Sequence, residues 1–381
     1  MIEPMERKLV LYSHLAFYPI HWQAFLHLCA HYRVRGTAIA VAQADLPLVH
    51  QQLGWVDPRT IGQDAYAPAV RILPARNRLA RVYQLCKELR RISPDAIWAQ
   101  EEPTDPYLLQ ILGMYLFNRR PRIVSAVCEN TFAPGSPAIR LSRRILWSRL
   151  DGLLAVATPS LEGIRAAGMP EGIPAASLVA GATAPPDQVD PLPLPFGRTA
   201  RDFVLGFVGR ICEEKGWKVL LTAMLSLPGS VYCLLAGDGP QIGELQEWMK
   251  RPKLRERVSY MGLLPKDMLW RFYAALDCLV LPSLTLPGWK EQFGGVLADG
   301  MAMGLPLIGS DSGAIPEVIG PAGLTVPEGE AEALGAAIER LQQSPDLCQN
   351  LGEAGRRRFR EEWAIPAYAT KIARMLGLIL R

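Results

Sequence analysis

The stretch Phe207-Val208-Gly209-Arg210-Ile211-Cys212-Glu213-Glu214-Lys215-Gly216-Trp217 predicts both a type of fold and a type of ligand. It continues the apolar run Phe203–Val208, whose lack of polar alternation indicates a strand buried on both faces of a parallel sheet. Arg210 and Lys215 flank the turn from this strand into a helix. Two cations and a helix N-terminus would converge there on an anion such as a diphosphate.

Similar apolar runs recur along the chain and are separated by segments of helical length. In the first half they cover residues 8–13, 37–42, 70–73, 96–99, 122–127, 152–157 and 177–180. In the second half they cover residues 203–208, 231–236, 257–261, 278–281, 305–309 and 324–326. Strands that alternate with helices in this way form parallel sheets. We therefore predict an α/β protein with two doubly wound, Rossmann-like domains facing a central cleft.

A proline-rich segment separates the two halves. Within residues 181–197 lie Pro185, Pro186, Pro191, Pro193 and Pro195. Because proline lacks an amide donor, this segment makes a poor strand or helix and a good semi-rigid linker. The predicted organisation is a first domain at 1–183, a linker at 184–200, a second domain at 201–362, and a C-terminal helix at 363–381 that could pack back on the first domain.

The composition excludes several classes of protein. The chain has 381 residues, of which 49% are hydrophobic and 20% charged, so it is too apolar for a disordered protein. A net charge of +4 argues against a protein that wraps nucleic acid. The charge is uneven, because residues 1–200 hold 21 basic and 16 acidic residues, whereas residues 201–381 hold 20 and 21.

The cysteines and the apolar runs indicate a cytoplasmic protein. Seven cysteines form no Cys-x-x-Cys pair, and several lie in apolar runs, so we expect reduced core residues. No stretch approaches the roughly 20 apolar residues that span a bilayer. The first six residues include two acids and show no apolar segment typical of a signal peptide.

Two further motifs lie in the second half. Gly237-Asp238-Gly239 follows a strand, where glycines either allow close backbone approach or form an ordinary turn. Phe293-Gly294-Gly295 opens an apparent helix whose first amides could donate to a sugar hydroxyl or a phosphate oxygen. Glu291 and Asp299 could accept from hydroxyls, and they would lie more than two turns apart if both were helical. Asp299 could equally be a charge on the helix surface.

In this order and spacing, the segments resemble the donor domain of a retaining glycosyltransferase of the GT-B fold, in glycosyltransferase family 4 and its bacterial polysaccharide or glycolipid type. The matching residues are Gly209-Arg210 with Lys215-Gly216, Gly237-Asp238-Gly239, Pro282-Ser283, Glu291 with Asp299, Gly304-Leu305-Pro306 and Gly313-Ala314-Ile315-Pro316-Glu317. The resemblance is strong over about residues 203–327, whereas the first half matches mainly in layout.

The resemblance implies transfer of a hexose from a UDP- or GDP-linked sugar to a hydroxyl of a glycan, a lipid-linked molecule or a small molecule, without a cofactor. Arg210 and Lys215 would hold the diphosphate and neutralise it as it leaves, and Glu291 would bind hydroxyls of the transferred sugar. The other donor-binding positions would be Gly209, Asp238, Gly239, Phe293, Gly294, Gly295, Val296 and Asp299. Asp299 would hold the ribose, although the family usually has glutamate there.

The implied reaction depends on positioning and charge stabilisation, because the leaving phosphate and the attacking hydroxyl lie on one face of the sugar. The chain has no Asp-x-Asp motif that would hold a metal, so we predict activity that survives a chelator. A nucleotide-sugar 2-epimerase of the same fold and a non-catalytic partner protein remain alternatives. A dinucleotide oxidoreductase is disfavoured, because Ser13-His14-Leu15 stands where a glycine-rich turn would be.

The first half departs further from the family pattern. Cys128-Glu129-Asn130 follows a strand after which many members have a histidine, whereas a bacterial subgroup with Glu-Asn there and a Glu-Glu-Pro matches Glu101-Glu102-Pro103. The candidates on the acceptor side are His14, Glu101, Glu102 and Glu129. Glu101 or Glu102 either binds or deprotonates the acceptor, or caps a helix or forms an ion pair. His14 is equally consistent with an ordinary loop residue.

A basic segment runs from Arg119 to Arg149, with seven arginines and a single acid, Glu129. Part of it mixes Ile139, Leu141 and Ile145 with arginines, as do basic amphipathic helices that lie on anionic bilayers. One hypothesis is therefore peripheral association with the inner face of the cytoplasmic membrane and a lipid-linked or anionic acceptor. The other is a helix packed on the first sheet with a solvated basic face.

Overall fold

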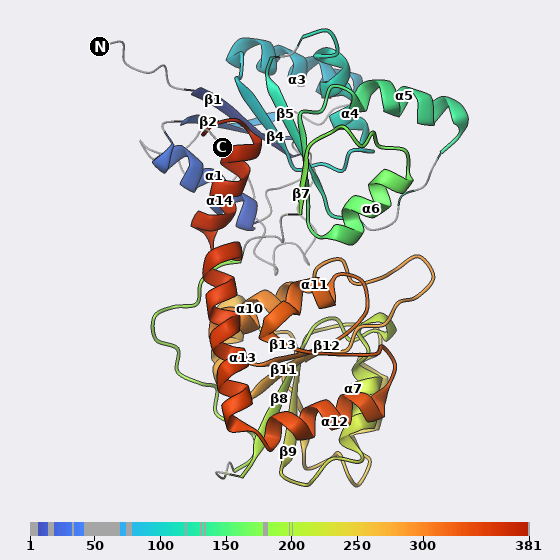
Figure 1. The fold of residues 1–381 in the computed structure, drawn as a ribbon, viewed down its shortest axis with the longest axis vertical. Coiled ribbons are helices and arrows are strands. Elements are labelled where there is room, and N and C mark those ends of the chain that lie inside the picture. The colour runs from blue at the N-terminus through green and yellow to red at the C-terminus, as the bar shows by residue number, and fades with distance from the viewer. Residues whose placement is uncertain are drawn as a thin grey trace. The chain divides into compact units, whose positions relative to one another are not determined.

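Each half of the chain folds around its own parallel sheet (Figure 1). The computed structural model describes residues 7–13, 19–32, 34–41, 69–73, 78–118, 120–129, 132, 135–177, 182–197, 199 and 201–379. Unit 1 comprises Met1–Gly181 and Ile365–Arg381, and unit 2 comprises Ala182–Ala364. Both sheets are wholly parallel, which confirms the predicted α/β class with two doubly wound domains.

Unit 1 contains a seven-stranded sheet in the order β3-β2-β1-β4-β5-β6-β7. Its strands are β1 (Arg7–Ser13), β2 (Val34–Val41), β3 (Ala69–Leu73), β4 (Ala96–Ala99), β5 (Arg122–Val127), β6 (Gly152–Ala155) and β7 (Ala175–Ser177). The chain order reverses between β1 and β4, which pair directly. The carboxyl ends of β1 and β4 therefore form a switch point, the place where open parallel sheets bind ligands.

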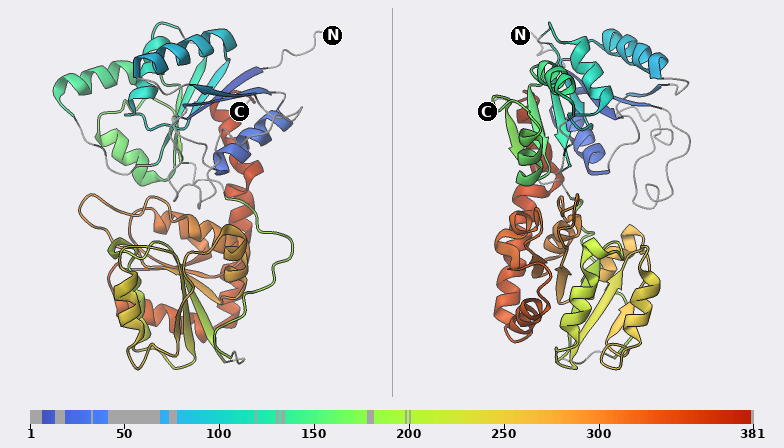
Figure 2. Two further views of the ribbon diagram at one scale, coloured as in Figure 1. Left: turned by 180° about the vertical axis from the view of Figure 1, so that it is seen from behind. Right: turned by 90° about the vertical axis from the view of Figure 1, so that its right-hand side faces the viewer.

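Helices cover both faces of this sheet (Figure 2). They are α1 (Pro19–His31), α3 (Arg78–Ile92), α4 (Pro106–Met114), α5 (Pro137–Trp147), α6 (Thr158–Ala166) and α14 (Ile365–Met375). Leu9 and Leu11 of β1 pack with α1 and α14, whereas Val10 and Tyr12 pack with α3 and α4. This alternation along one strand follows from the two-residue period of β structure.

The end of the chain contributes to unit 1. α14 lies against α1, where the Thr370 and Tyr32 hydroxyls are 2.9 Å apart. The Tyr368 ring of α14 stacks on the His21 ring of α1 at 6.0 Å between centroids. Tyr368 is buried, so a helix distant in sequence completes one of the two cores of unit 1.

Unit 2 repeats the strand order in a six-stranded sheet, β10-β9-β8-β11-β12-β13. Its strands are β8 (Phe203–Val208), β9 (Val231–Ala236), β10 (Val258–Tyr260), β11 (Cys278–Leu281), β12 (Leu307–Ser310) and β13 (Gly323–Val326). Here the switch point lies between β8 and β11, so segments that follow these two strands meet at one edge of the sheet.

The helices of unit 2 pack around a core that includes Phe207 of β8, Trp217 and Ile338. They are α7 (Trp217–Met224), α8 (Ile242–Met249), α9 (Lys266–Ala274), α10 (Gly295–Met303), α11 (Ile315–Ile319), α12 (Ala331–Gln342) and α13 (Pro345–Arg358). Short turns of 3-10 helix occur at Glu213–Lys215 and Gly320–Ala322, and a π-helical turn occurs at Phe359–Trp363.

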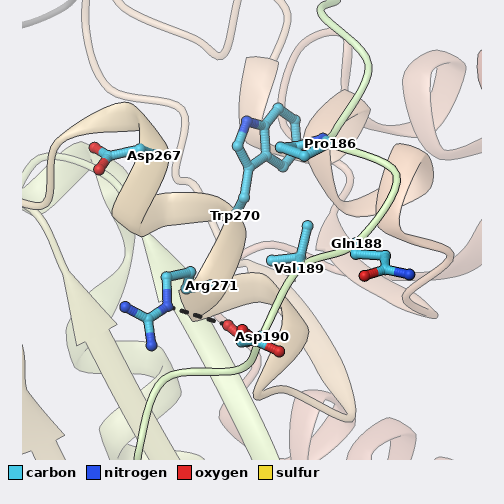
Figure 3. Close-up of a pocket in the computed structure, with 7 residues that line it drawn as sticks. All are labelled: Pro186, Gln188, Val189, Asp190, Asp267, Trp270 and Arg271. Atoms are coloured by element: carbon cyan, nitrogen blue, oxygen red, sulfur yellow. Dashed lines mark hydrogen bonds between the residues drawn. The ribbon is translucent and has the colours of Figure 1, made fainter.

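The proline-rich segment is anchored to unit 2. The Leu192 amide donates to the Arg271 carbonyl at 2.9 Å. Arg271 Nε donates to the Asp190 carbonyl at 3.2 Å (Figure 3). Between this segment and α9 lies a pocket of about 630 Å³, lined by Pro186, Gln188, Val189, Asp190, Asp267, Trp270 and Arg271. Proline removes amide donors but leaves carbonyl acceptors, so the expected linker can still be fixed through its carbonyls and apolar side chains.

None of the seven cysteines forms a disulfide, and Cys212, Cys233 and Cys278 are buried. Within the part of the chain that the structure describes, no helix has both the length and the apolar character needed to cross a bilayer.

Candidate functional site

The loop after β8 is held against the end of β11 by a glycine. Gly216 has a left-handed conformation, with φ of 66°. A Cβ atom at this position would lie 1.7 Å from the Pro282 carbonyl oxygen, so no other residue fits. The Leu284 amide also donates to the Glu214 carbonyl at 2.8 Å. This close approach places Lys215 directly beside Ser283.

Lys215, Glu291 and Ser283 form the most closely connected polar cluster at this switch point. Lys215 Nζ lies 2.6 Å from Glu291 Oε2, and the two side chains are 18% and 7% exposed. Ser283 Oγ donates to the same carboxylate oxygen at 2.7 Å. Lys215 Nζ also lies 5.0 Å from the centroid of the Trp289 ring, within the range of a cation–π contact. A partly buried lysine is thus held by a carboxylate and an aromatic ring.

The backbone fixes Glu291 from a second direction. The Ala314 amide donates to the Glu291 carbonyl at 3.0 Å. Gly313 has φ of 57°, and a Cβ there would lie 2.0 Å from the same carbonyl oxygen. Glu291 precedes α10, which begins at Gly295, so the condition that Glu291 and Asp299 are both helical is not met. The chain turns sharply at Gly294 before the helix, which brings Glu291 back to β11.

Arg210 is more exposed than Lys215 and less closely paired, although the two residues flank the same turn. Its side chain is 69% exposed, and its Nη1 lies 3.7 Å from Glu214 Oε1, a long contact for an ion pair. Lys215 is therefore preorganised, whereas Arg210 can still move toward an anion.

The Gly237-Asp238-Gly239 turn packs against the backbone on either side of Arg210. Gly237 has φ of 147°, and a Cβ there would lie 1.8 Å from the Gly209 carbonyl oxygen. A Cβ on Gly239 would lie 2.4 Å from the Ile211 carbonyl oxygen. Asp238 is exposed, and its carboxylate accepts from the Gly239 amide at 2.8 Å. The glycines thus act through close backbone packing, while Asp238 stabilises its own turn.

The N-terminus of α10 lies next to this cluster in sequence. Gly294 caps the helix with φ of 73°, and the first amides of the helix, Gly295 and Val296, have no acceptor within it. Gly295 is exposed, and a Cβ added to it would approach only the Phe293 ring, at 3.9 Å. The Phe293 ring also meets Trp363 edge-on at 6.3 Å between centroids. The Gly295 and Val296 amides therefore have space next to them in which they can donate to an anion or a hydroxyl.

Asp299 occupies the second turn of α10 and is partly buried. The Tyr273 hydroxyl donates to Asp299 Oδ2 at 3.4 Å. Burial raises the pKa of Asp299 to about 7, although nearby Lys266 and the Tyr273 hydrogen bond act in the opposite direction. Tyr273, which lies 26 residues away on α9, was not identified from the sequence.

At the switch point of unit 1, the Glu102 carboxylate is held by backbone amides. Glu102 Oε1 accepts from the amides of Cys128 at 2.7 Å and Glu129 at 3.0 Å. Among the described residues, its Oε2 is buried and has no hydrogen-bond partner. Burial raises the pKa of Glu102 to about 7. Because Glu102 follows β4 and its two donors follow β5, the register of these parallel strands brings them together.

The other acceptor-side candidates have different surroundings. Glu101 is buried, and its carbonyl accepts from Ser125 Oγ at 2.7 Å. The Glu129 side chain is exposed, and His14 lies outside the described residues. The sequence did not reveal His21, which is buried on α1. Burial lowers the pKa of His21 to about 4, against the effect of a hydrogen bond with Gln100, so this histidine is neutral at pH 7.

The strand orders and the similarity to known structures define the class of fold. The structure of Anabaena HepE in complex with UDP has a TM-score of 0.73 at 17% identity, covering 98% of this chain and 100% of that chain. The galactosyltransferase WaaB of the lipopolysaccharide outer core has a TM-score of 0.70 at 16% identity, covering 97% and 99%. Together with the two Rossmann-like units, these matches show that the chain has the GT-B fold.

A family model then identifies unit 2 more closely. Residues 202–344 match Glycosyl transferases group 1, which confirms the resemblance carried by the motifs of this unit. The 2-deoxystreptamine glucosyltransferase of Streptomyces kanamyceticus is 30% identical over 194 residues, 47% of this chain and 49% of that protein. A GDP-mannose-dependent phosphatidylinositol monomannoside mannosyltransferase of Mycobacterium tuberculosis is 26% identical over 176 residues, 44% and 46%. The chain thus spans about half the length of the curated relatives it matches.

Proposed function

We propose that the protein is a retaining, metal-independent glycosyltransferase that moves a hexose from a UDP- or GDP-linked sugar to an acceptor hydroxyl. The observation that carries this proposal is the Lys215–Glu291 pair at the β8–β11 switch point, where partly buried Lys215 lies 2.6 Å from buried Glu291. It lies within the segment that matches Glycosyl transferases group 1. The UDP bound to HepE, which shares the fold, supports a nucleotide-sugar donor.

The arrangement suits a reaction in which a diphosphate leaves. The Lys215 ammonium has three donors, so it can keep its bond to Glu291 while it also donates to a phosphate oxygen. Exposed Arg210 would close on the same diphosphate, and the α10 amides would add neutral donors. These groups stabilise negative charge that develops on the leaving group, which is the role we assign to Arg210 and Lys215.

The donor sugar and the ribose would contact the carboxylates of this edge. Glu291 Oε1 would accept from hydroxyls of the transferred sugar, while Oε2 stays with Lys215 and Ser283. Asp299 would hold the ribose hydroxyls, as a carboxylate one methylene shorter than the glutamate usual in the family. With a pKa of about 7, Asp299 is partly protonated at neutral pH, so donor binding should strengthen as the pH rises through 7.

On the acceptor side, Glu102 is the best-supported candidate. A carboxyl group with a pKa of about 7 is matched to taking a proton from a hydroxyl at neutral pH. Glu101, Glu129 and His14 remain candidates for binding acceptor hydroxyls. The names of the relatives include a small aminocyclitol and a phosphatidylinositol mannoside as acceptors, which supports either a small-molecule or a lipid-linked acceptor.

A panel of UDP- and GDP-sugars tests the proposal. Thermal-shift measurements identify the donor, because a ligand at about 100 times its dissociation constant stabilises the protein by about 2.7 kcal/mol. Product formation is then followed with candidate acceptors in the presence of EDTA, and NMR of the product reports the configuration at the anomeric carbon. An inverted product, or activity lost with EDTA, contradicts the mechanism.

A pair of variants tests the assignment of Arg210. Arg210→Ala should lower transfer by on the order of a hundredfold or more without unfolding the protein. Arg255→Ala is the matched control, because the Arg255 side chain is 66% exposed, close to the 69% of Arg210, and pairs with neighbouring Glu256. Near-normal turnover of Arg210→Ala would overturn the assignment. An epimerised sugar nucleotide formed without acceptor would indicate the 2-epimerase, and donor binding without transfer would indicate a non-catalytic protein.

A further inference from the structure

The outer face of α5 exposes apolar side chains that a packed helix would normally bury. Leu141 is 62% exposed, Ile145 is 49% exposed and Ile139 is 45% exposed. Leu141 and Ile145 are four residues apart, so they lie one above the other on a single face of the helix. Leu141 and Ile145 therefore form a continuous apolar ridge on the surface of unit 1.

The opposite face of α5 is already fixed to the rest of unit 1. Trp147 is buried, and its Nε1 donates to the Pro103 carbonyl at 2.7 Å. Buried Arg149, just beyond the helix, donates through Nε to the Tyr115 carbonyl at 2.8 Å and pairs with Asp151 at 2.7 Å. The fold thus anchors α5 by its inner face, and the exposed ridge is not needed to hold the helix in place.

Positive charge lies directly beside the ridge. Arg140 and Arg144 are also four residues apart, each one position before a residue of the ridge, and both are exposed. The helix contains no aspartate or glutamate. We call Leu141, Ile145, Arg140 and Arg144 the α5 face. It combines an apolar strip with a basic strip, the pattern of helices that lie in the plane of a bilayer interface.

We propose that the α5 face is a docking surface for an anionic lipid bilayer, with Leu141 and Ile145 inserted among the lipids and the arginines at the headgroups. A second copy of the chain fits poorly, because the arginines of two such faces would repel each other. A nucleic acid would use the arginines but leave the apolar ridge in water. The inference goes beyond sugar transfer, and it places the protein where a lipid-linked acceptor would be found.

Sedimentation with vesicles tests this surface without any substrate. The whole protein is mixed at low salt with vesicles of phosphatidylcholine and phosphatidylglycerol, or of phosphatidylcholine alone. We expect sedimentation with the anionic vesicles, weaker binding to the neutral ones, and weaker binding as salt is raised. Leu141→Glu with Ile145→Glu should lower the partition coefficient by at least about tenfold. Arg144→Ala should lower it less, and only with anionic vesicles.

Matched controls come from α3 of the same unit. Tyr83 is 66% exposed there, and Arg90 is exposed in its last turn, so Tyr83→Glu and Arg90→Ala make the same changes elsewhere and should bind like the wild type. Unchanged circular dichroism and melting show that each variant is folded. The proposal is overturned if the wild type stays in the supernatant, or if the double variant binds normally. Because no donor is present, a failure here leaves the transferase assignment intact, and the reverse holds as well.

Discussion

The two switch points of the molecule have the same strand geometry and opposite electrostatics. In unit 2, the carboxylate after β11, Glu291, meets an ammonium at 2.6 Å and a hydroxyl at 2.7 Å. In unit 1, the carboxyl after β4, Glu102, meets two backbone amides, and one of its oxygens is buried without a partner among the described residues. One edge is built around a fixed cation and the other around a carboxyl group that is readily protonated.

This difference shows how one strand topology can present two electrostatic environments. An ammonium held against a carboxylate offers charged donors at a fixed position, which suits the diphosphate site proposed above. Burial raises the pKa of the Glu102 carboxyl to about 7, which suits the proton transfer proposed above. Four predictions test whether the contrast is as sharp as the contacts indicate.

The largest effect is expected from Lys215→Ala, which removes the ammonium from the buried Glu291 carboxylate. Removing one partner of a largely buried pair costs up to about 3–5 kcal/mol of stability, and loss of the cation beside the leaving diphosphate should cost on the order of a hundredfold in transfer. Lys218→Ala is the control, because Lys218 also lies 2.6 Å from a carboxylate, that of Glu244, but these side chains are 38% and 43% exposed. The control should lose at most about 1 kcal/mol in denaturant unfolding. Equal losses would mean that the Lys215 pair is not preorganised.

A somewhat smaller effect is expected from Gly216→Ala. Its Cβ would meet the Pro282 carbonyl oxygen at 1.7 Å, so the β8 loop must move away from β11 and carry Lys215 with it. We expect a loss of about 2–4 kcal/mol in urea unfolding and weaker donor binding. Gly243→Ala on α8 meets no atom within 4 Å and should stabilise by about 0.5–1 kcal/mol. A Gly216→Ala variant with unchanged stability and donor binding would contradict the role given to this contact.

The next effect belongs to unit 1 and depends on pH. The pKa of Glu102 rises from 4.5 in the unfolded chain to about 7 in the folded one, so ionisation opposes folding. The stability of the wild type should fall by about 1–3 kcal/mol, relative to Glu102→Gln, as the pH rises from about 4.5 through 7. Denaturant unfolding at pH 4.5 and 8 measures this difference. The control is Glu171→Gln, at an exposed position, whose free energy of unfolding should change with pH as that of the wild type does. If the stability of Glu102→Gln also changes with pH in parallel with the wild type, ionisation of Glu102 does not oppose folding.

The smallest effect is expected from Tyr273→Phe. The lost hydrogen bond to Asp299 is 3.4 Å long, so its removal should change the free energy of unfolding by about 0.5–1 kcal/mol. The Tyr273 hydroxyl lowers the pKa of Asp299, so its loss should move the pH at which donor binding strengthens further above 7. Isothermal titration with the donor nucleotide at several pH values measures the shift. If the pH profile of donor binding is unchanged, Asp299 does not contact the donor.

The strands and the donor motifs were predictable from the sequence, because they depend on local patterns. Continuous apolar runs located β8 and β11, and the glycines marked the turns that follow β8 and β9. The pairing of Lys215 with Glu291 was not predictable in detail, since it joins residues 76 positions apart through the contact of Gly216 with Pro282. The assignment of both residues to the same donor remains a prediction.

Other features depend on tertiary burial and left no trace in the sequence. The Glu102 carboxylate accepts from two amides that follow the neighbouring strand β5, and Asp299 accepts from Tyr273 on another helix. The shifts in their pKa values follow from desolvation, which a list of residues does not reveal. The glutamate pair after β4 was correctly singled out as polar groups at a strand end, but only the packing distinguishes buried Glu101 from the half-buried carboxyl of Glu102.

The ends of unit 2 lie side by side. The Ala182 amide donates to the Trp363 carbonyl at 2.9 Å, and Ala182 forms a parallel bridge with Ala364. Unit 2 is thus one uninterrupted segment that enters and leaves at a single point, while α14 completes the core of unit 1. A segment whose two ends lie close together can be replaced as one piece. We therefore expect that residues 182–364 can be exchanged as a block between related proteins, whereas a chain cut before α14 would lose part of the core of unit 1.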